Sequence, residues 1–259
     1  MMHFMMKMPD YPLLVFAISF IGLTLSAWIG VLIPRKERMA EAEAREDFGV
    51  IQAATLTLLG LIIAFSFSMG LGRYDQRKNY EEAEANAIGT EYVRADLLPT
   101  ADAAKVRSLL LRYLDQRILF YISRDDQQLR QINEQTAKLQ AQLWSAVSAP
   151  ALVQPTPVAA LVVAGMNDVL NSQGYTQAAW WYRIPVAAWV LMAAIAICSN
   201  VLVGLGIRNV KTERRLLLVL PLVLSIAFLL IADIDSPRGG VILVRPLNLV
   251  SLAQSLRAQ

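Results

Sequence analysis

The side chains that most often carry out enzyme chemistry are scarce in this sequence. It contains one histidine, His3, and one cysteine, Cys198. A lone histidine near the N-terminus removes the usual general base of a nucleophile–base triad and the usual zinc ligand. A lone cysteine excludes an intrachain disulfide and a multi-cysteine metal cluster. We therefore predict no catalytic residues, no bound metal and no cofactor, and we expect that the protein is not an enzyme.

Polar residues within one long apolar run suggest a different chemistry, the passage of ions. Residues 48–72 are mostly apolar but include Gln52, Thr55, Thr57, Ser66 and Ser68. Leu61 and Phe65 share one face of the expected helix, and Arg73 follows two turns beyond Phe65. A ring of such faces around an axis would form a hydrophobic gate. Spacing alone favours the alternative, in which Ser and Gly let neighbouring helices pack closely.

A second polar stretch lies further along the chain, where small residues alternate with acids over residues 81–96. Glu84 and Asn86 belong to this stretch. The pattern is typical of closely packed helices with buried polar contacts. The residues alone nevertheless favour a solvated face, with helical pairs such as Glu91 with Arg94.

Two more carboxylates, Asp233 and Asp235, directly follow an apolar run. They could cap backbone groups, pair with an arginine or coordinate a cation, but two carboxylates are too few to indicate a calcium site. Ion pairing at the membrane edge is the favoured interpretation. We therefore name Glu84, Asn86, Asp233 and Asp235 as candidate membrane-edge polar contacts.

The elements that must position these residues are mainly membrane helices. The hydrophobic residues make up 56% of the chain and the mean hydropathy is +0.43, whereas soluble domains are about 45–50% apolar. The excess lies in four runs, Tyr11–Ile33, Phe48–Gly72, Pro185–Ile207 and Leu216–Ala232. Each approaches the roughly 20 residues that cross a bilayer. The first run is longer than the roughly 7–15 apolar residues of a removable signal peptide, so we expect it to be retained.

Between the second and third runs the chain is charged and shows no strand alternation. The second run continues without a turn signal to Pro99, which predicts one helix of about 50 residues. Three more helices are expected, over residues 101–123, 125–147 and 157–172. Thr100, Asp125 or Asp126, and Thr156 are their expected N-caps, and Gly174 follows the end of the last helix.

These patterns predict an all-α integral membrane protein with four transmembrane helices and a helical extramembrane domain between spans 2 and 3. Its parts are residues 1–72 (spans 1 and 2), 73–182 (soluble domain), 183–235 (spans 3 and 4) and 236–259 (tail). The net charge of +3 requires no nucleic-acid partner. The two sides of the membrane carry similar numbers of Lys and Arg, so the positive-inside rule leaves the orientation open.

The sequence resembles the bacterial bestrophin-like proteins over residues 48–246. The resemblance is carried by Phe65–Arg77, Glu82–Leu98 and Asp233–Gly239. Its most specific part is Glu84-Ala-Asn-Ala-Ile-Gly-Thr90, followed by Arg94-Ala-Asp-Leu-Leu-Pro99. True bestrophins are more distantly similar. The resemblance to true bestrophins implies four spans, a pentamer whose second spans form the pore neck, and a soluble domain in the cytoplasm.

The resemblance also implies roles for individual residues. The second span of bestrophins carries a Phe about two turns ahead of an Arg-aromatic pair, and Phe65 and Arg73-Tyr74 have the same spacing here. Counting back from Phe65 one helical turn at a time places Leu61 and Thr57 at the pore constriction with it. Arg73, Arg77 and Lys78 would line the pore mouth and attract anions. Thr57 departs from an all-apolar neck. Asp235-Ser-Pro237-Arg238-Gly239 is only loosely similar to the bestrophin Asp-Pro-Phe-Gly motif, and the acidic calcium clasp of animal bestrophins has no clear counterpart.

Two functions follow as hypotheses. The first is an oligomeric bestrophin-like channel for small monovalent anions, lined by the second span, in the inner membrane of a bacterium. Its partners would be the lipid bilayer, further copies of the chain and small ions. The second is a non-conducting sensor or scaffold, whose Gln-rich helix after Asp125 binds a partner.

Overall fold

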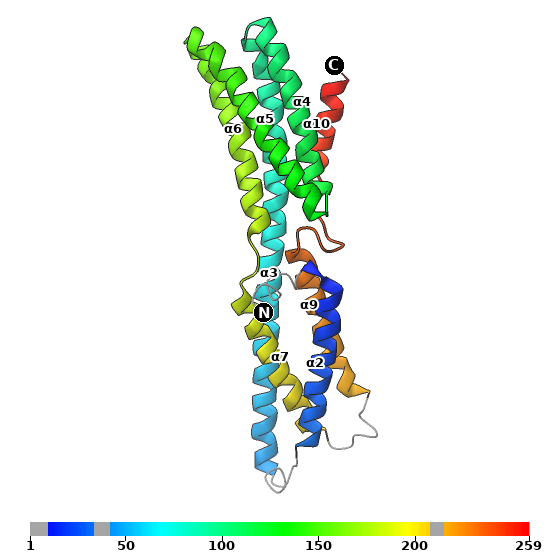
Figure 1. Ribbon diagram of the computed structural model, residues 1–259. Coiled ribbons are helices and arrows are strands. Elements are labelled where there is room, and N and C mark those ends of the chain that lie inside the picture. The colour runs from blue at the N-terminus through cyan, green and yellow to red at the C-terminus, as the bar shows by residue number, and fades with distance from the viewer. Residues whose placement is uncertain (1–9, 34–41, 208–214, 259) are drawn as a thin grey trace. The chain divides into compact units, whose positions relative to one another are not determined.

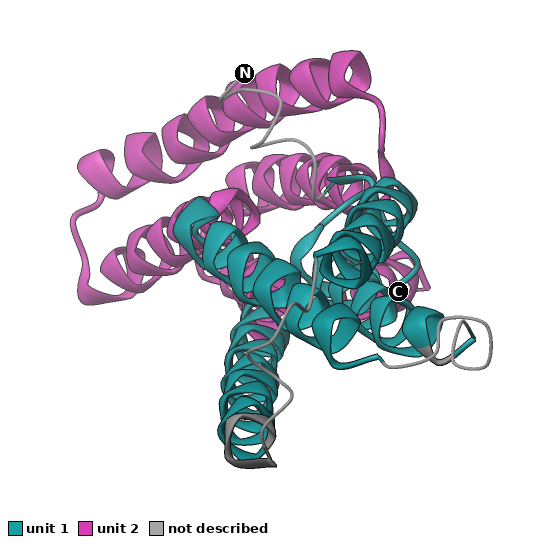
Figure 2. Cartoon of the chain, turned by 90° about the horizontal axis from the view of Figure 1, so that it is seen from below, with its two compact units in different colours: residues 1–73, 183–243 teal, residues 74–182, 244–259 magenta. Residues whose placement is uncertain are grey.

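The structure is a computed structural model, and it describes residues 10–33, 42–207 and 215–258. Every regular element in these ranges is a helix, as the sequence predicts. The helices divide between two compact units (Figures 1 and 2). Unit 1 comprises residues 1–73 and 183–243, and unit 2 comprises residues 74–182 and 244–259.

Helix α3 (Ala42–Arg94) contributes to both units as one continuous helix of 53 residues. The prediction of a single long helix that includes the second apolar run and continues beyond it is therefore confirmed. At 1.5 Å per residue it extends for roughly 80 Å. It begins ahead of the second apolar run, and it continues through Gly70 and Gly72 without interruption.

Unit 1 contains α2 (Pro12–Leu32), the first part of α3, α7 (Val186–Gly206) and α9 (Leu216–Asp235). Helix α2 packs against both α7 and α9. Val15, Leu23, Met192 and Phe228 belong to its buried apolar core. The buried share of their most apolar segments ranges from 6% in α3 to 50% in α9.

Helices α2 and α7 cross with their backbones in close contact. A Cβ added at Gly30 would overlap the carbonyl oxygen of Val201, and one added at Gly204 would overlap that of Ala27. Small residues at such crossings are typical of membrane helices, which pack by close backbone approach. Gly30 and Gly204 therefore set the separation of these two helices.

Four helical stretches among the described residues are long and apolar enough to cross a membrane, judged by length and composition. They are Pro12–Leu32, Glu46–Leu97, Pro157–Gly206 and Leu217–Asp235. Each contains or closely matches one of the four apolar runs of the sequence.

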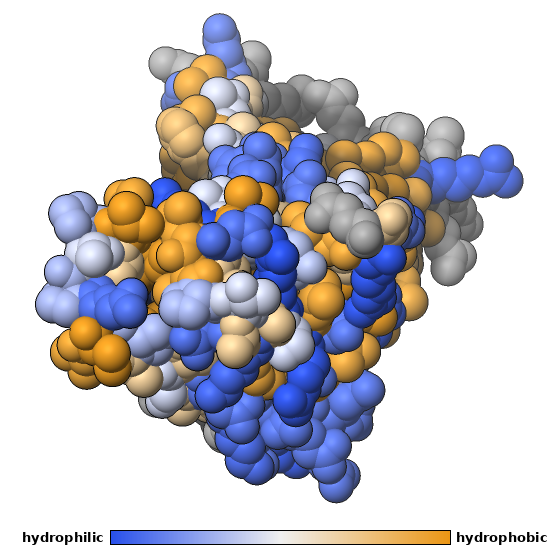
Figure 3. Space-filling view, turned by 90° about the horizontal axis from the view of Figure 1, so that it is seen from above, coloured by the Kyte–Doolittle hydropathy of each residue, from blue (hydrophilic) through white to orange (hydrophobic). Residues whose placement is uncertain are grey.

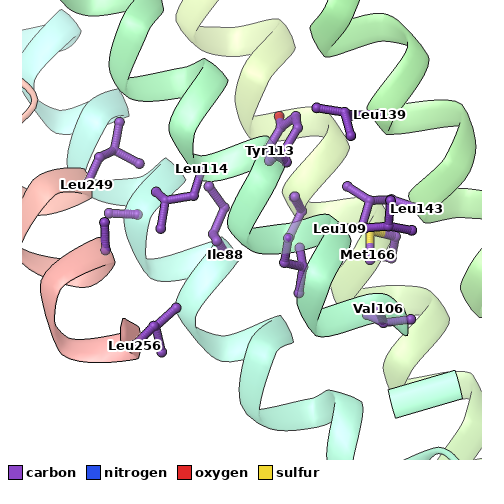
Figure 4. Close-up of a cluster of buried hydrophobic side chains, with 14 of the residues drawn as sticks. Ile88, Val106, Leu109, Tyr113, Leu114, Leu139, Leu143, Met166, Leu249 and Leu256 are labelled. Carbon is purple, nitrogen blue, oxygen red and sulfur yellow. The ribbon is translucent and has the colours of Figure 1, made fainter. Parts of the chain in front are cut away.

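Unit 2 is a helical bundle built from the rest of α3, α4 (Thr100–Ile122), α5 (Asp126–Val153), α6 (Pro157–Trp181) and α10 (Leu247–Arg257). A short 3₁₀ helix, η2 (Ala95–Leu97), joins α3 to α4. Ile88, Leu114, Leu143 and Met166 meet in its core (Figure 4). The face of the molecule drawn in Figure 3 carries many hydrophilic side chains with hydrophobic ones between them.

Two predicted helix caps of unit 2 are confirmed. The Asp125 side chain accepts a hydrogen bond from the backbone N–H of Gln128 at 2.7 Å. The Thr156 hydroxyl accepts one from the N–H of Ala159 at 3.1 Å. Each cap satisfies one of the donors left free at a helix N-terminus.

Other predicted boundaries in unit 2 are wrong. Thr100 is the first residue of α4 rather than its cap, and α5 continues through Pro150 to Val153. Helix α6 passes through Gly174 and ends at Trp181. A glycine costs a helix about 1 kcal/mol, but Thr176 and Trp180 are buried beyond it. Their burial offsets that cost.

Helix α10 lies within the predicted C-terminal tail. Leu249, Ala253 and Leu256 are buried in the core of unit 2. Leu252 lies 3.1 Å from the position that a Cβ at Gly89 would take. The tail therefore supplies part of this core.

Candidate pore helix and buried polar networks

The predicted constriction residues lie along an exposed face of α3. Thr57, Leu61 and Phe65 follow one another at intervals of four residues, and all three are exposed. The exposed fractions are 64% for Phe65 and 52% for Leu61. Only 6% of the most apolar segment of this helix is buried. The three side chains are thus free to face either a second copy of the chain, lipid or an aqueous pore.

The three predicted pore-mouth cations differ in their surroundings. Lys78 is exposed, and Arg73 is half-buried with its Nη2 3.7 Å from the Met69 Sδ. Arg77 is only 1% exposed. It is the one member of the set that the fold encloses.

Arg77 instead binds the end of α6. Its Nε donates to the carbonyl oxygen of Ala179 at 3.2 Å, and its Nη2 donates to that of Tyr182 at 3.3 Å. The last carbonyls of a helix have no partner within the helix, and a cation there also interacts well with the helix dipole. Arg77 therefore caps α6, and its side chain is enclosed within unit 2.

Asp233 and Asp235 bind backbone groups of unit 1. Asp233 accepts from the N–H of Val241 at 2.8 Å and from that of Ile242 at 2.9 Å. Asp235 accepts from the N–H of Ile184 through both oxygens, at 3.1 and 3.2 Å. Of the roles considered from the sequence, backbone capping is the one seen in these contacts.

An ion pair is present beside these carboxylates, but it uses a different acid. Arg183 binds the carboxylate of Asp10, and its Nη1 donates to the backbone oxygen of Asp235 at 3.1 Å. The sequence reasoning missed Asp10, because one acid before an apolar run carries no signal of its partner. The cluster joins the start of α2, the approach to α7 and the end of α9.

The Gly-Gly pair that follows is explained by the same cluster. A Cβ added at Gly239 would overlap the carbonyl oxygen of Asp10, and one at Gly240 would overlap the carboxylate of Asp233. Glycine therefore lets the chain pass close to both groups.

Glu84 lies in the interior of unit 2, where it pairs with Arg117, and both side chains are fully buried. The Tyr121 hydroxyl and the Thr176 Oγ1 lie 3.4 Å and 3.2 Å from the Glu84 Oε2. Burial is the largest effect on Arg117 and acts to lower its pKa, but the charge and hydrogen bond of Glu84, together with Tyr113 and Tyr121, outweigh it, so the pKa is raised. Asn86, two residues on, is exposed. Of these two predicted polar contacts, Glu84 is the buried one.

Two further buried acids of α3 were not among the predicted site residues. Glu81 accepts from the backbone N–H of Leu249 at 3.0 Å and from the Asn248 side chain at 2.6 Å, at the start of α10. Glu91 is also fully buried. Their spacing from Glu84 places all three acids on one side of the helix, a signal that the sequence contains.

Among the described residues, no group of three or more His, Cys, Asp or Glu side chains is arranged to hold a metal ion. The polar clusters above are made instead of ion pairs and capped backbone groups. These contacts hold the helices in position relative to one another within each unit.

Comparison with known proteins identifies the relatives of this chain. The family model of the bestrophin-like domain matches residues 23–249. A search of curated proteins found no match. Among solved structures, a bacterial bestrophin homologue from Klebsiella pneumoniae aligns with a TM-score of 0.60 at 14% identity. The alignment covers 93% of this chain and 95% of that one.

Variants of the Klebsiella pneumoniae homologue align similarly. One has a TM-score of 0.62 at 12% identity, covering 93% of this chain and 96% of that one. Another has 0.60 at 13%, covering 94% and 96%. Likeness at this identity shows a shared fold, and the family match covers most of the sequence. The chain therefore belongs to the bestrophin-like family.

Proposed function

We propose that the protein is an oligomeric ion channel of bestrophin type, with a pore lined by α3 and formed by several copies of the chain. The observation that carries the proposal is the exposed row of Thr57, Leu61 and Phe65 on a helix that the rest of the chain leaves largely uncovered. The family supports the same function, since bestrophins are channels.

The composition of α3 around its axis supports assembly. Leu59, Ser66 and Gly70 form its buried side. At 100° per residue, the opposite side carries Thr57, Leu61, Ala64 and Ser68, which are all exposed and, apart from Leu61, small or polar. Lipid-facing positions are usually larger and more apolar, whereas small residues favour contact between helices. This side is therefore suited to neighbouring copies of α3 around an axis.

The hydroxyl of Thr57 does not prevent it from lining an apolar constriction. Its Oγ1 donates to the carbonyl oxygen of Ala53 at 2.9 Å, within the same helix. The hydroxyl thereby has a partner without water or a second chain. Its methyl group is left to face the pore with Leu61 and Phe65.

Small monovalent anions are the proposed permeant ions. Arg73 and Lys78 are the two predicted mouth cations that retain exposed surface. Positive side chains at a pore entrance raise the local concentration of anions. We further propose four membrane spans in a bacterial inner membrane, a cytoplasmic unit 2 and, from the family resemblance, a pentamer.

The test is ion flux through purified protein in planar bilayers, with Phe65→Ala and Leu61→Ala. Both variants should change conductance or selectivity, because each widens the apolar constriction. Phe67→Ala is the matched control. It removes the same side chain from an exposed position about 200° around the helix from Phe65, and it should conduct as the unmodified protein does.

The oligomeric state, measured by native mass spectrometry, completes the test. A monomer, or absence of conductance in every form, would overturn the proposal. Equal effects of Phe65→Ala and Phe67→Ala would also contradict it, because the pore would then not lie on the predicted face.

A further inference from the structure

Three acids of α3 are buried in unit 2, and they differ in the groups that bind their carboxylates. Glu81 caps the N-terminus of α10, and Glu84 pairs with Arg117. Glu91 is 0% exposed, yet neither carboxylate oxygen has a hydrogen-bond partner among the described residues. A buried carboxylate without partners is costly when it is ionised. Glu91 is thus the acid whose protonation state the fold leaves free to change.

The site of Glu91 is built by close contact with α6. A Cβ added at Gly165 would overlap both the Glu91 Oε2 and the Arg94 side chain. Glycine at this position is what lets α6 lie against the carboxyl group. Any swelling of the site, such as entry of water to solvate a charge, must therefore move α6 away.

The charged groups that act on the Glu91 carboxylate come from α3 and α6. Arg94 lies one turn on in α3 and favours the ionised form, while Asp168 of α6 opposes it. Arg107 of α4 is engaged elsewhere, since it pairs with Asp96 and its Nε donates to the Tyr92 carbonyl at 3.4 Å. The nearest cation is thus partly offset by an acid.

Burial is the largest effect on this group. It raises the pKa of Glu91 from 4.5 to about 8, with Arg94 lowering it and Asp168 raising it further. Glu91 lies in unit 2, well beyond the apolar stretch of α3 that ends at Gly72. Near neutral pH the carboxyl group is therefore mostly protonated, and it ionises over a mildly alkaline range.

We propose that Glu91 is a proton-binding site that controls the packing of α3 against α6. The neutral acid allows the close contact at Gly165, and the carboxylate loosens it because water must enter to solvate the charge. The ligand of this site is the proton itself. The proposal concerns unit 2 alone, so it stands or falls independently of whether the protein conducts ions.

The sign of the pH effect follows from the two protonation states. Between about pH 4.5 and about pH 8 the closed form holds a proton that the open or unfolded form has lost. The contact is therefore fully stabilised at the acidic end and weakens as the pH rises through this window. Above the folded-state pKa no further change is expected.

Hydrogen exchange of the full-length protein in detergent tests the contact. Rates for the α6 segment around Gly165 are divided by their intrinsic chemical rates and compared at about pH 6.5 and about pH 9. Protection should fall by up to roughly tenfold per pH unit in the window. Glu91→Gln, which cannot ionise, should abolish that fall. Glu82→Gln, at an exposed acid of the same helix, should retain it.

Infrared difference spectra between the same two pH values test the proton directly. The unmodified protein and Glu82→Gln should lose a protonated-carboxyl band at the higher pH, and Glu91→Gln should lack that loss. A band loss unchanged by Glu91→Gln, or no titrating carboxyl in this range, would overturn the proton site. Equal pH dependence of α6 exchange in Glu91→Gln and the unmodified protein would overturn the coupling to packing.

Discussion

Glu84 of α3 and Arg117 of α4 form an ion pair in which both side chains are fully buried. The guanidinium also lies over the ring of Phe120, with its Cζ 4.4 Å from the ring centroid. Removing one member of such a pair leaves an uncompensated charge in the interior, which costs more than the pair itself contributes.

Arg117→Met should therefore lower the free energy of unfolding by about 3–5 kcal/mol. Arg112→Met, at an exposed position of the same helix, is the control and should stay within about 0.5 kcal/mol. Denaturant unfolding followed by tryptophan fluorescence is suitable, because Trp180 packs against Phe120 in this region. The double variant Glu84→Gln/Arg117→Met should recover part of the loss. Equal stability of Arg117→Met and Arg112→Met would contradict the prediction.

The close crossing of α2 and α7 predicts a strong effect of one added methyl group. Gly204→Ala should separate the two backbones and lower stability by about 1–3 kcal/mol, measured by thermal unfolding in detergent. Gly22→Ala is the control, since no atom lies within 4 Å of its added Cβ. It should be neutral or slightly stabilising, because alanine is the better helix former. Similar losses for both variants would mean that the crossing is not the cause.

The contact of Glu81 with the start of α10 predicts that this helix depends on one distant carboxylate. Glu81→Ala should leave the N–H of Leu249 without its acceptor and cost about 1–3 kcal/mol. Hydrogen exchange over residues 247–257 should then rise. Glu82→Ala removes an exposed neighbouring acid and should leave α10 protected. Unchanged exchange in Glu81→Ala would show that apolar packing alone holds α10.

Asp233 predicts a graded effect on the segment that follows α9. Asp233→Asn keeps one of the two oxygens that accept from Val241 and Ile242, whereas Asp233→Ala keeps neither. Exchange of residues 238–243 should increase in that order, at a cost of about 1–3 kcal/mol per unsatisfied group. Val241→Ala is the control because that side chain is 91% exposed and its backbone N–H is retained. Equal effects of all three variants would contradict the capping role.

Much of the local structure is predictable from the sequence. The apolar runs identify the membrane-type helices, since their length and hydropathy are properties of the run itself. The caps Asp125 and Thr156 are likewise local signals. The ends of α5 and α6 are not predictable in this way, because Pro150 and Gly174 are helix breakers by propensity. In α6 the burial of Thr176 and Trp180 beyond Gly174 decides otherwise.

The sequence by itself determined which residues are polar within apolar surroundings. It thereby showed that α3 has a more polar apolar run than the other long helices. Only the tertiary structure decided what those residues bind. Glu84 meets Arg117 across 33 residues, Glu81 meets Leu249 across 168, and Asp10 meets Arg183 across 173. Such partners are chosen by packing, because a buried charge must find an opposite charge or a backbone group wherever the fold brings one. For the same reason Arg77, buried inside unit 2, donates to carbonyl oxygens at the end of α6. Glu91 departs from this rule, since neither of its carboxylate oxygens has a hydrogen-bond partner among the described residues.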